Sequence, residues 1–263
     1  MSDQRTILSD MTDPDFVNSL ARGLAVMGAF GRGNKKMTLT QVAERTGLTR
    51  GTARRFLRTL CTLGYMATDE KLFWLTPKVL KFSSNYLLTF GLGETAYAHI
   101  QELTERLGET SSMSVLDDEE IVYVARVEKR RVFSNRIEVG TRLPAHSTSM
   151  GLVLLAGLGD KELEGWLKTA SLQAFTQNTI TDKAALRRRL AQVRENGYAV
   201  TDGSLEIGVR SLSVPVRDGN HKVIAALNVV TFASQMSMDD MLARFLEPLR
   251  TAAGKLGGIL SID

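Results

Sequence analysis

Apolar residues recur every three or four positions in the N-terminal part of the chain, a spacing typical of amphipathic helices. The first such series predicts a helix that begins near Asp13-Pro14 and ends in the turn sequence Gly31-Arg32-Gly33-Asn34. The apolar residues that repeat at this spacing are Phe16, Leu20, Leu24, Met27 and Phe30. A second, shorter helix is predicted over residues 38–47, with Thr38 as its N-cap and Gly47 at its end.

Residues 49–63 predict a third helix, capped by Thr49, whose apolar and cationic side chains lie on opposite arcs. The apolar arc holds Ala53, Phe56, Leu57, Leu60 and Leu63. The other arc holds Arg50, Arg54 and Arg58, with Arg55 at its edge, and the helix has no acidic residue. This charge would suit a groove lined with phosphates and guanines. A solvated basic face is the alternative interpretation.

Two short alternating runs, residues 65–68 and 72–75, flank the turn Asp69-Glu70-Lys71 and predict a hairpin, or wing. Two helices joined by a Gly-containing turn, the second of them cationic, are typical of a helix-turn-helix. We therefore expect a flexible tail at residues 1–13 and a winged helix-turn-helix domain at 14–76. The turn at residues 31–34 lacks the Gly-Lys-Ser/Thr ending of a phosphate loop.

The rest of the chain predicts a linker helix over residues 77–93 and an α+β domain over residues 94–263. GLGETA at 91–96 matches a dinucleotide fingerprint, but a helix rather than a strand precedes it, so we interpret its glycines as a hinge. Helices are expected at 94–108, 146–157, 160–168, 182–197 and 236–260, and strands at 110–117, 121–128, 131–140, 198–202, 210–218 and 222–232.

Composition narrows the possible functions. A single cysteine, Cys61, excludes an internal disulfide, and one cysteine with three histidines argues against a structural zinc site. We expect no metal, no cofactor and no membrane span, and a cytoplasmic location, since the N-terminus has no signal-peptide core. Residues 16–81 carry 12 Lys or Arg against 3 acidic residues, whereas residues 94–263 carry 20 against 22. The positive charge therefore belongs to the N-terminal domain, as expected of a nucleic-acid-binding module.

The order of SLARGLAVMGAF, LTQVAERTGLTRGTARRFLRTLCTLGY and the wing resembles the DNA-binding half of the IclR family of bacterial transcription regulators. The resemblance covers essentially the whole chain and is greatest to the subgroup that controls aromatic-acid catabolism through the β-ketoadipate pathway. The wing turn departs from it, since many relatives have a glycine there. The resemblance implies a GAF-like effector domain, with an antiparallel sheet flanked by helices, that binds a small ligand and joins subunits.

Three segments match the effector-domain motifs of the family: residues 140–157, 195–218 and 223–231. The sequence departs from the commoner pattern at Thr201 and Gly203, where acidic residues are frequent. By position, the resemblance implies effector-binding roles for His146, Ser147, Thr148, Ser149, Thr201, Asp202, Glu206, Arg210, Ser211, Ser213 and Asn228.

Elementary chemistry supports a small acid as the ligand of these residues. Thr148 and Ser149 precede an apolar helix, whose free N–H groups and dipole favour an anion. Polar residues in apolar strands need hydrogen-bond partners, and Arg210 could bind a carboxylate with two bonds. The alternative is that Ser147 to Ser149 only cap a helix and that Arg210 pairs with Glu206.

Together these features predict a ligand-responsive transcription regulator that binds operator DNA as a homodimer or a dimer of dimers. Arg50 and Arg54 would reach base edges, Arg55 and Arg58 would hold phosphates, and Gly51 would allow close approach. The remaining DNA-binding candidates are Thr38, Thr49, Thr52 and Lys71. The expected effector is a small carboxylic acid such as protocatechuate, 4-hydroxybenzoate or β-ketoadipate.

Three alternatives remain open at this point. The chain could regulate another small-acid pathway, or could be an enzyme with a basic accessory domain. A Ser-His-Asp set exists on paper, but His146 has no G-x-S-x-G partner. A nonspecific architectural DNA binder would leave the second domain without a purpose.

Overall fold

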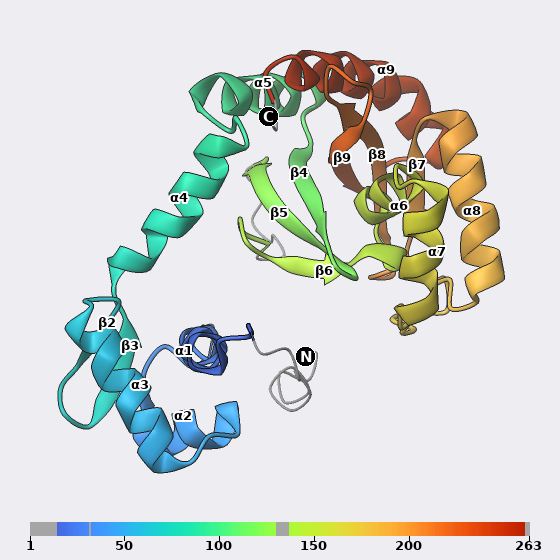
Figure 1. Ribbon diagram of the computed structural model, residues 1–263. Coiled ribbons are helices and arrows are strands. Elements are labelled where there is room, and N and C mark those ends of the chain that lie inside the picture. The colour runs from blue at the N-terminus through green and yellow to red at the C-terminus, as the bar shows by residue number, and fades with distance from the viewer. Residues whose placement is uncertain (1–14, 32, 130–136, 261–263) are drawn as a thin grey trace. The chain divides into compact units, whose positions relative to one another are not determined.

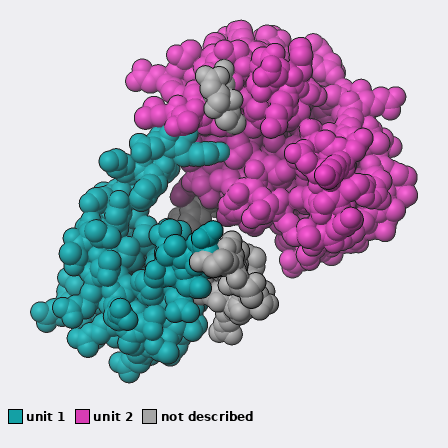
Figure 2. All heavy atoms as spheres, in the orientation of Figure 1, with its two compact units in different colours: residues 1–86 teal, residues 87–263 magenta. Residues whose placement is uncertain are grey.

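A computed structural model of the chain describes residues 15–31, 33–129 and 137–260. Residue contacts divide the chain into two compact units, residues 1–86 and 87–263 (Figure 2). Within the described ranges, no helix is both long enough and apolar enough to cross a lipid bilayer.

The first unit contains α1 (Asn18–Gly28), α2 (Leu39–Thr46) and α3 (Arg50–Thr62), together with β1 (Met37–Thr38), β2 (Met66–Thr68) and β3 (Leu72–Leu75). The strands form an antiparallel sheet in the order β1-β3-β2. The wing hairpin was predicted, but β1 was not, because two residues are too few to show a period. The sequence predicted that the first helix begins near Asp13-Pro14. Among the described residues it begins at Asn18, and Asp15 to Val17 are not helical.

Local capping positions the helix-turn-helix as the sequence predicted. The Thr38 hydroxyl accepts a hydrogen bond from Gln41 N, and Gln41 Oε1 accepts one from Thr38 N, which completes a capping box. Gly47 ends α2 with φ 68°, a left-handed conformation that glycine adopts without strain. The Thr49 hydroxyl caps α3 through Thr52 N, so the predicted N-caps of both helices are confirmed.

The apolar arc of α3 packs into the core of the first unit. Ala53, Leu57 and Leu60 are buried with Val26 of α1 and Val42 of α2. The predicted arc extended one residue too far, because Leu63 follows the helix and is 51% exposed.

A short 3-10 helix, Pro77–Val79, leads into the linker helix α4 (Leu80–Thr89). The boundary between the two units lies inside α4, between Tyr86 and Leu87. Gly91 follows α4 with φ 80°, and a Cβ there would lie 3.0 Å from Ile259 O. The C-terminal end of the linker is therefore packed against the last described residues of the second unit.

The second unit is a six-stranded antiparallel sheet with helices on both faces (Figure 1). Its strand order is β6-β5-β4-β9-β8-β7, formed by β4 (Thr110–Asp117), β5 (Glu120–Val127), β6 (Arg142–Pro144), β7 (Ala199–Asp202), β8 (Val209–Arg217) and β9 (Val223–Phe232). The helices are α5 (Glu94–Leu107), α6 (Ser149–Ala156), α7 (Asp160–Thr169), α8 (Lys183–Asn196) and α9 (Met238–Gly257). The α+β fold is confirmed.

We call the face of this sheet that packs against α5 and α9 the back face, and the face beneath α6 the front face (Figure 1). The back face packs against an apolar core that includes Met113, Leu212 and Leu227 of the sheet and Phe245 of α9. The front face carries a second core under α6, α7 and α8, and several polar residues beside it.

The expected strand over residues 131–140 needs correction. Residues 130–136 lie outside the described ranges, and residues 137–140 are not strand but lead into a turn in which Gly140 has φ 87°. The strand in this region is the short β6, which pairs with β5. This strand has only three residues, too few for an alternating pattern to be visible in the sequence.

Candidate functional site

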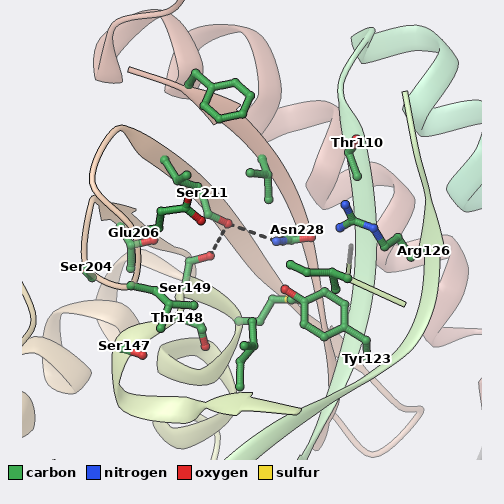
Figure 3. Close-up of a pocket in the computed structure, with 18 of the residues that line it drawn as sticks. Thr110, Tyr123, Arg126, Ser147, Thr148, Ser149, Ser204, Glu206, Ser211 and Asn228 are labelled. Carbon is green, nitrogen blue, oxygen red and sulfur yellow. Dashed lines mark hydrogen bonds between the residues drawn. The ribbon is translucent and has the colours of Figure 1, made fainter. Parts of the chain in front are cut away.

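A cavity of about 140 Å³ lies between the front face of the sheet and the start of α6 (Figure 3). Seven of the effector-site residues named from the sequence line it, and they come from α6, β7, β8, β9 and the connections beside them. These seven are Ser147, Thr148, Ser149, Thr201, Glu206, Ser211 and Asn228.

The start of α6 presents unpaired backbone donors to this cavity. Thr148 is the N-cap, and its hydroxyl accepts a hydrogen bond from Gly151 N at 3.1 Å. The N–H groups of Ser149 and Met150 have no hydrogen-bond partner among the described residues. A Cβ at position 151 would lie 2.0 Å from Ala145 O, so only glycine permits this close turn. The result is a buried helix start that favours an anion.

Buried hydroxyls connect α6 to the sheet. Ser149 Oγ lies 2.7 Å from Ser211 Oγ and 2.6 Å from Ser213 Oγ, and Asn228 Nδ2 donates to Ser211 Oγ at 3.1 Å. Asn228 is 2% exposed, and its Oδ1 has no hydrogen-bond partner among the described residues. Because a buried acceptor without a donor is costly, the cavity suits an occupant that donates a hydrogen bond.

Arg126 of β5 is a largely buried cation in the cavity lining, and the sequence interpretation missed it. Its side chain is 11% exposed, with Nε 2.9 Å from Glu128 Oε1 and Nη1 donating to Ser112 Oγ at 3.2 Å. Nη2 has no partner among the described residues. In Figure 3 the guanidinium enters the cavity from the side opposite Ser149.

A β-bulge explains why Arg126 faces the cavity. Tyr123 pairs with Ser114 and Arg126 with Ser112, although simple alternation from Tyr123 would turn Arg126 to the other face. The visible sequence signal is a charged residue inside an apolar strand, together with the alternating polar series Thr110, Ser112 and Ser114. Other polar residues of the cavity that were not named from the sequence are Thr110, Tyr123, Lys129 and Ser204.

Tyr123 lies on the cavity wall with 4% exposure, and its hydroxyl points inward (Figure 3). Burial raises its pKa to about 12, an effect that the positive charge of Arg126 partly opposes. The hydroxyl is therefore neutral at physiological pH and can donate or accept a hydrogen bond.

Four residues named from the sequence lie outside the cavity lining: His146, Asp202, Arg210 and Ser213. Arg210 forms an ion pair with Asp202 at 2.9 Å, not the pair with Glu206 considered as the alternative to ligand binding, and donates to Met236 O at 2.6 Å. His146 Nε2 donates to Gln173 O at 2.9 Å. Arg210 alternates with Ser211 on β8, so its side chain points to the back face.

The DNA-binding candidates are mostly exposed on the first unit. Arg50, Arg54, Arg55 and Arg58 are exposed on α3, and none of them has an ion pair or side-chain hydrogen bond among the described residues. Gly51 lies in the first turn of α3, where a Cβ would meet no atom within 4 Å. Thr38, Thr49 and Thr52 carry their hydroxyls at the starts of α2 and α3, and Lys71 is exposed in the wing turn.

The wing turn has a strained backbone. Glu70 has φ 76°, a left-handed conformation that is unfavourable for a residue with a Cβ. The Asp69 carboxylate stabilises the turn by accepting hydrogen bonds from Lys71 N and Leu72 N, and these bonds lower its pKa. A further cation that the sequence interpretation missed, Lys36, lies 4.2 Å above the Trp74 ring.

Comparisons with known proteins agree with this architecture. The IclR helix-turn-helix domain matches residues 19–70, and the C-terminal domain of the bacterial transcriptional regulator IclR matches residues 84–257. The Pca regulon regulatory protein of Pseudomonas putida is 40% identical over 244 residues, which cover 92% of this chain and 84% of that protein. The p-hydroxybenzoate hydroxylase transcriptional activator of Acinetobacter baylyi is 38% identical over 252 residues, with 94% and 93% coverage.

A solved structure is also similar over nearly the whole chain. It is an IclR homolog from Microbacterium hydrocarbonoxydans in complex with 4-hydroxybenzoate, with a TM-score of 0.78 and 27% identity. The match covers 92% of this chain and 98% of that one.

A winged helix-turn-helix followed by an α+β unit with a buried polar cavity defines a DNA-binding transcription regulator with an effector domain. The chain belongs to the IclR family of bacterial transcriptional regulators. This family consists of transcription regulators rather than enzymes. The alternative that the second unit is a catalytic domain is therefore rejected.

Proposed function

We propose that this regulator controls genes of aromatic-acid catabolism and senses a small carboxylic acid in the cavity under α6. The observation that carries the proposal is the unpaired polar lining: two N–H groups at the start of α6 and the Asn228 Oδ1 acceptor. A cavity of about 140 Å³ matches a single-ring compound, since one of roughly 150 Å³ accommodates benzene. The names of the relatives and the 4-hydroxybenzoate complex support the same class of ligand.

The cavity has two polar ends, and we assign a different role to each. The carboxylate binds at the start of α6, where the N–H groups of Ser149 and Met150 are free among the described residues and the first turn contains no acidic residue. Arg126, Tyr123 and Asn228 form the other end, which binds a ring hydroxyl or a second carboxylate. Protocatechuate, 4-hydroxybenzoate and β-ketoadipate each have such a pair of polar ends.

Thermal shift and calorimetry on the full chain with these three acids test the assignment. We expect at least one acid to raise the melting temperature, because a ligand that binds only the folded state stabilises it. Arg126→Gln is expected to weaken that binding by about tenfold or more, since a charged hydrogen-bond partner is lost. Arg217→Gln, an exposed position of β8, is the matched control.

Two outcomes of this experiment would change the proposal. If none of the three acids shifts the melting temperature, the chain regulates a different small-acid pathway. If Arg217→Gln weakens binding as much as Arg126→Gln does, the assignment of the second polar end is wrong.

We also infer how the first unit binds operator DNA. Arg50 and Arg54 on α3 contact base edges, while Arg55, Arg58 and Lys71 contact phosphates. Arg55→Ala is expected to weaken binding to all sequences and to lower the slope of log K against log salt by roughly 1. Arg54→Ala is expected to relax base preference at one position instead, as measured by binding to an operator library.

We propose that the regulator binds DNA as a dimer, since one recognition helix covers too few base pairs for a specific site. An exposed apolar stripe, formed by Leu20 and Leu24 of α1 and by Val17 just before it, is the candidate interface with a second copy. Analytical ultracentrifugation of Leu20→Glu/Leu24→Glu is expected to show a smaller species than wild type. Leu88→Glu on α4 is the companion variant, and dissociation in that variant alone would move the interface to the linker helix.

A further inference from the structure

The connection between α7 and α8 contains no helix or strand, yet it contacts two walls of the cavity. We call residues 171–181 the strap. Its apolar residues Leu172 and Ile180 pack against the front core, and Ser171 N donates to Glu119 Oε2 at 3.1 Å. Both ends of the strap are therefore anchored to the domain.

The middle of the strap is hydrogen-bonded to the loop that follows β7. The Thr176 hydroxyl donates to Gly203 O at 2.6 Å, and the Thr179 hydroxyl donates to Ser204 O at 2.6 Å. Asn178 Nδ2 donates to Asp202 O at 3.1 Å. Three side chains of one segment thus bind three successive carbonyls of the other.

The same two threonines also fold the strap itself. Thr179 Oγ1 accepts hydrogen bonds from Phe175 N and Thr176 N, and Thr176 Oγ1 accepts one from Asn178 N. Since a hydroxyl has one proton, each threonine gives that proton to the loop and uses its lone pairs within the strap. The geometry that holds the loop is therefore set by local turns of the strap.

A side chain at Gly203 would crowd this contact. This residue has φ 67°, and a Cβ there would lie 3.1 Å from Asn178 Nδ2.

The strap reaches the opposite wall through His146, whose Nε2 donates to Gln173 O. His146 immediately precedes Ser147, Thr148 and Ser149, and the loop after β7 supplies Ser204, Leu205 and Glu206, all of which line the cavity. No residue of the strap lines the cavity itself. The strap therefore links the segment that precedes α6 to the loop that follows β7 without itself lining the cavity.

We propose that Thr176, Asn178 and Thr179 are positioning residues for the effector: they fix residues 202–206 as a wall of the cavity and so set how slowly a bound acid leaves. This inference rests on the proposed function for the identity of the ligand. The attachment of the loop by the strap is independent of it, because it is a property of the ligand-free protein.

Hydrogen exchange on the ligand-free full chain tests the attachment. Gly203 N donates to Val209 O and Val209 N to Glu206 O, so these two amides report opening of the loop. In Thr176→Val/Thr179→Val they are expected to exchange about tenfold faster or more, while amides of α8 are unchanged. Thr176→Ser/Thr179→Ser retains both hydroxyls and is expected to restore slow exchange. Gln177→Ala, exposed on the strap, is the matched control.

Stopped-flow binding of 4-hydroxybenzoate, protocatechuate and β-ketoadipate tests the consequence. The double valine variant is expected to release the acid that binds wild type about tenfold faster, with little change in the association rate, and the serine variant is expected to release it at the wild-type rate. Asn178→Ala is the milder variant, and it decides the question if the double valine variant does not fold.

The possible outcomes test the attachment of the loop by the strap separately from the identity of the effector. Unchanged exchange at Gly203 and Val209 would overturn the attachment. Faster exchange with an unchanged release rate would overturn the positioning role. Failure of all three acids to bind wild type would contradict the proposed effector class, while the exchange data would still decide whether the strap holds the loop.

Discussion

The two faces of the six-stranded sheet are built from alternate residues of the same strands, yet beside the cavity their chemistry differs. Leu227 lies on the back face in an aliphatic core, whereas its neighbour Asn228 lies on the front face beside buried serines. The same contrast separates Leu212 from Ser211. A domain that needed only stability would fill both faces with aliphatic residues, so the polar front face indicates a surface shaped for a ligand.

The two faces also contribute differently to the stability of the domain. Burial of apolar surface on the back face stabilises the fold, whereas an unpaired buried acceptor such as Asn228 Oδ1 costs about 1–3 kcal/mol. Binding sites commonly reduce stability in this way. Substitutions on the two faces should therefore differ in sign as well as in size.

The largest effect is expected for Leu227→Asn on the back face. The change removes a fully buried aliphatic side chain and places an amide where no partner exists, which together should cost about 4 kcal/mol or more. Urea denaturation followed by circular dichroism measures this loss. Leu227→Met keeps the position apolar and is expected to cost less than about 1.5 kcal/mol.

The next effect concerns the glycine that lets α6 approach Ala145. Gly151→Ala would place a Cβ 2.0 Å from a backbone oxygen, so the segment that begins α6 must shift. We expect a loss of about 3 kcal/mol in the free energy of unfolding. Gly165→Ala, at an exposed position of α7 with open space around it, is expected to stabilise the protein by about 0.5–1 kcal/mol. Equal effects of the two variants would contradict the importance of this contact.

A pH dependence is expected from the front face through Tyr123. The pKa of Tyr123 rises from 10.0 to about 12 in the fold, which favours the neutral phenol. Its contribution to stability is therefore complete below pH 10 and is lost as the pH rises toward 12. By pH 11.5 wild type should have lost about 2 kcal/mol relative to Tyr123→Phe, as measured by urea denaturation at pH 8 and pH 11.5. A constant difference between the two proteins would show that this tyrosine is not held neutral.

The features that could be predicted from the sequence are those fixed by neighbouring residues. Thr38, Thr49 and Gly47 begin or end helices through contacts within four positions, so the helix-turn-helix and its exposed arginines follow from the pattern. The residues at the start of α6 were named from the family resemblance, and the apolar helix that follows Thr148 and Ser149 supported that choice. A local signal thus agreed with the resemblance for one wall of the cavity.

The features that could not be predicted depend on register between distant segments. One bulge opposite Met113 and Ser114 turns Arg126 toward the cavity, and simple alternation turns Arg210 away from it. The family resemblance named Arg210, whereas the arginine that lines the cavity is Arg126. The strap was missed as well, because its hydrogen bonds join residues more than twenty positions apart.

The smallest effect, and the one with the opposite sign, is expected for Asn228→Leu on the front face. This change removes the buried acceptor that has no partner and adds apolar volume beside the cavity, at the cost of the bond to Ser211. The ligand-free protein should therefore be as stable as wild type or more stable, by about 1 kcal/mol. Binding of the acid that stabilises wild type should weaken at least about tenfold, because the ligand loses a hydrogen bond and cavity space. Calorimetry and urea denaturation on the same sample compare the two quantities. A variant that loses both stability and binding would show that Asn228 is a structural residue, and that the two faces of the sheet differ less than their composition suggests.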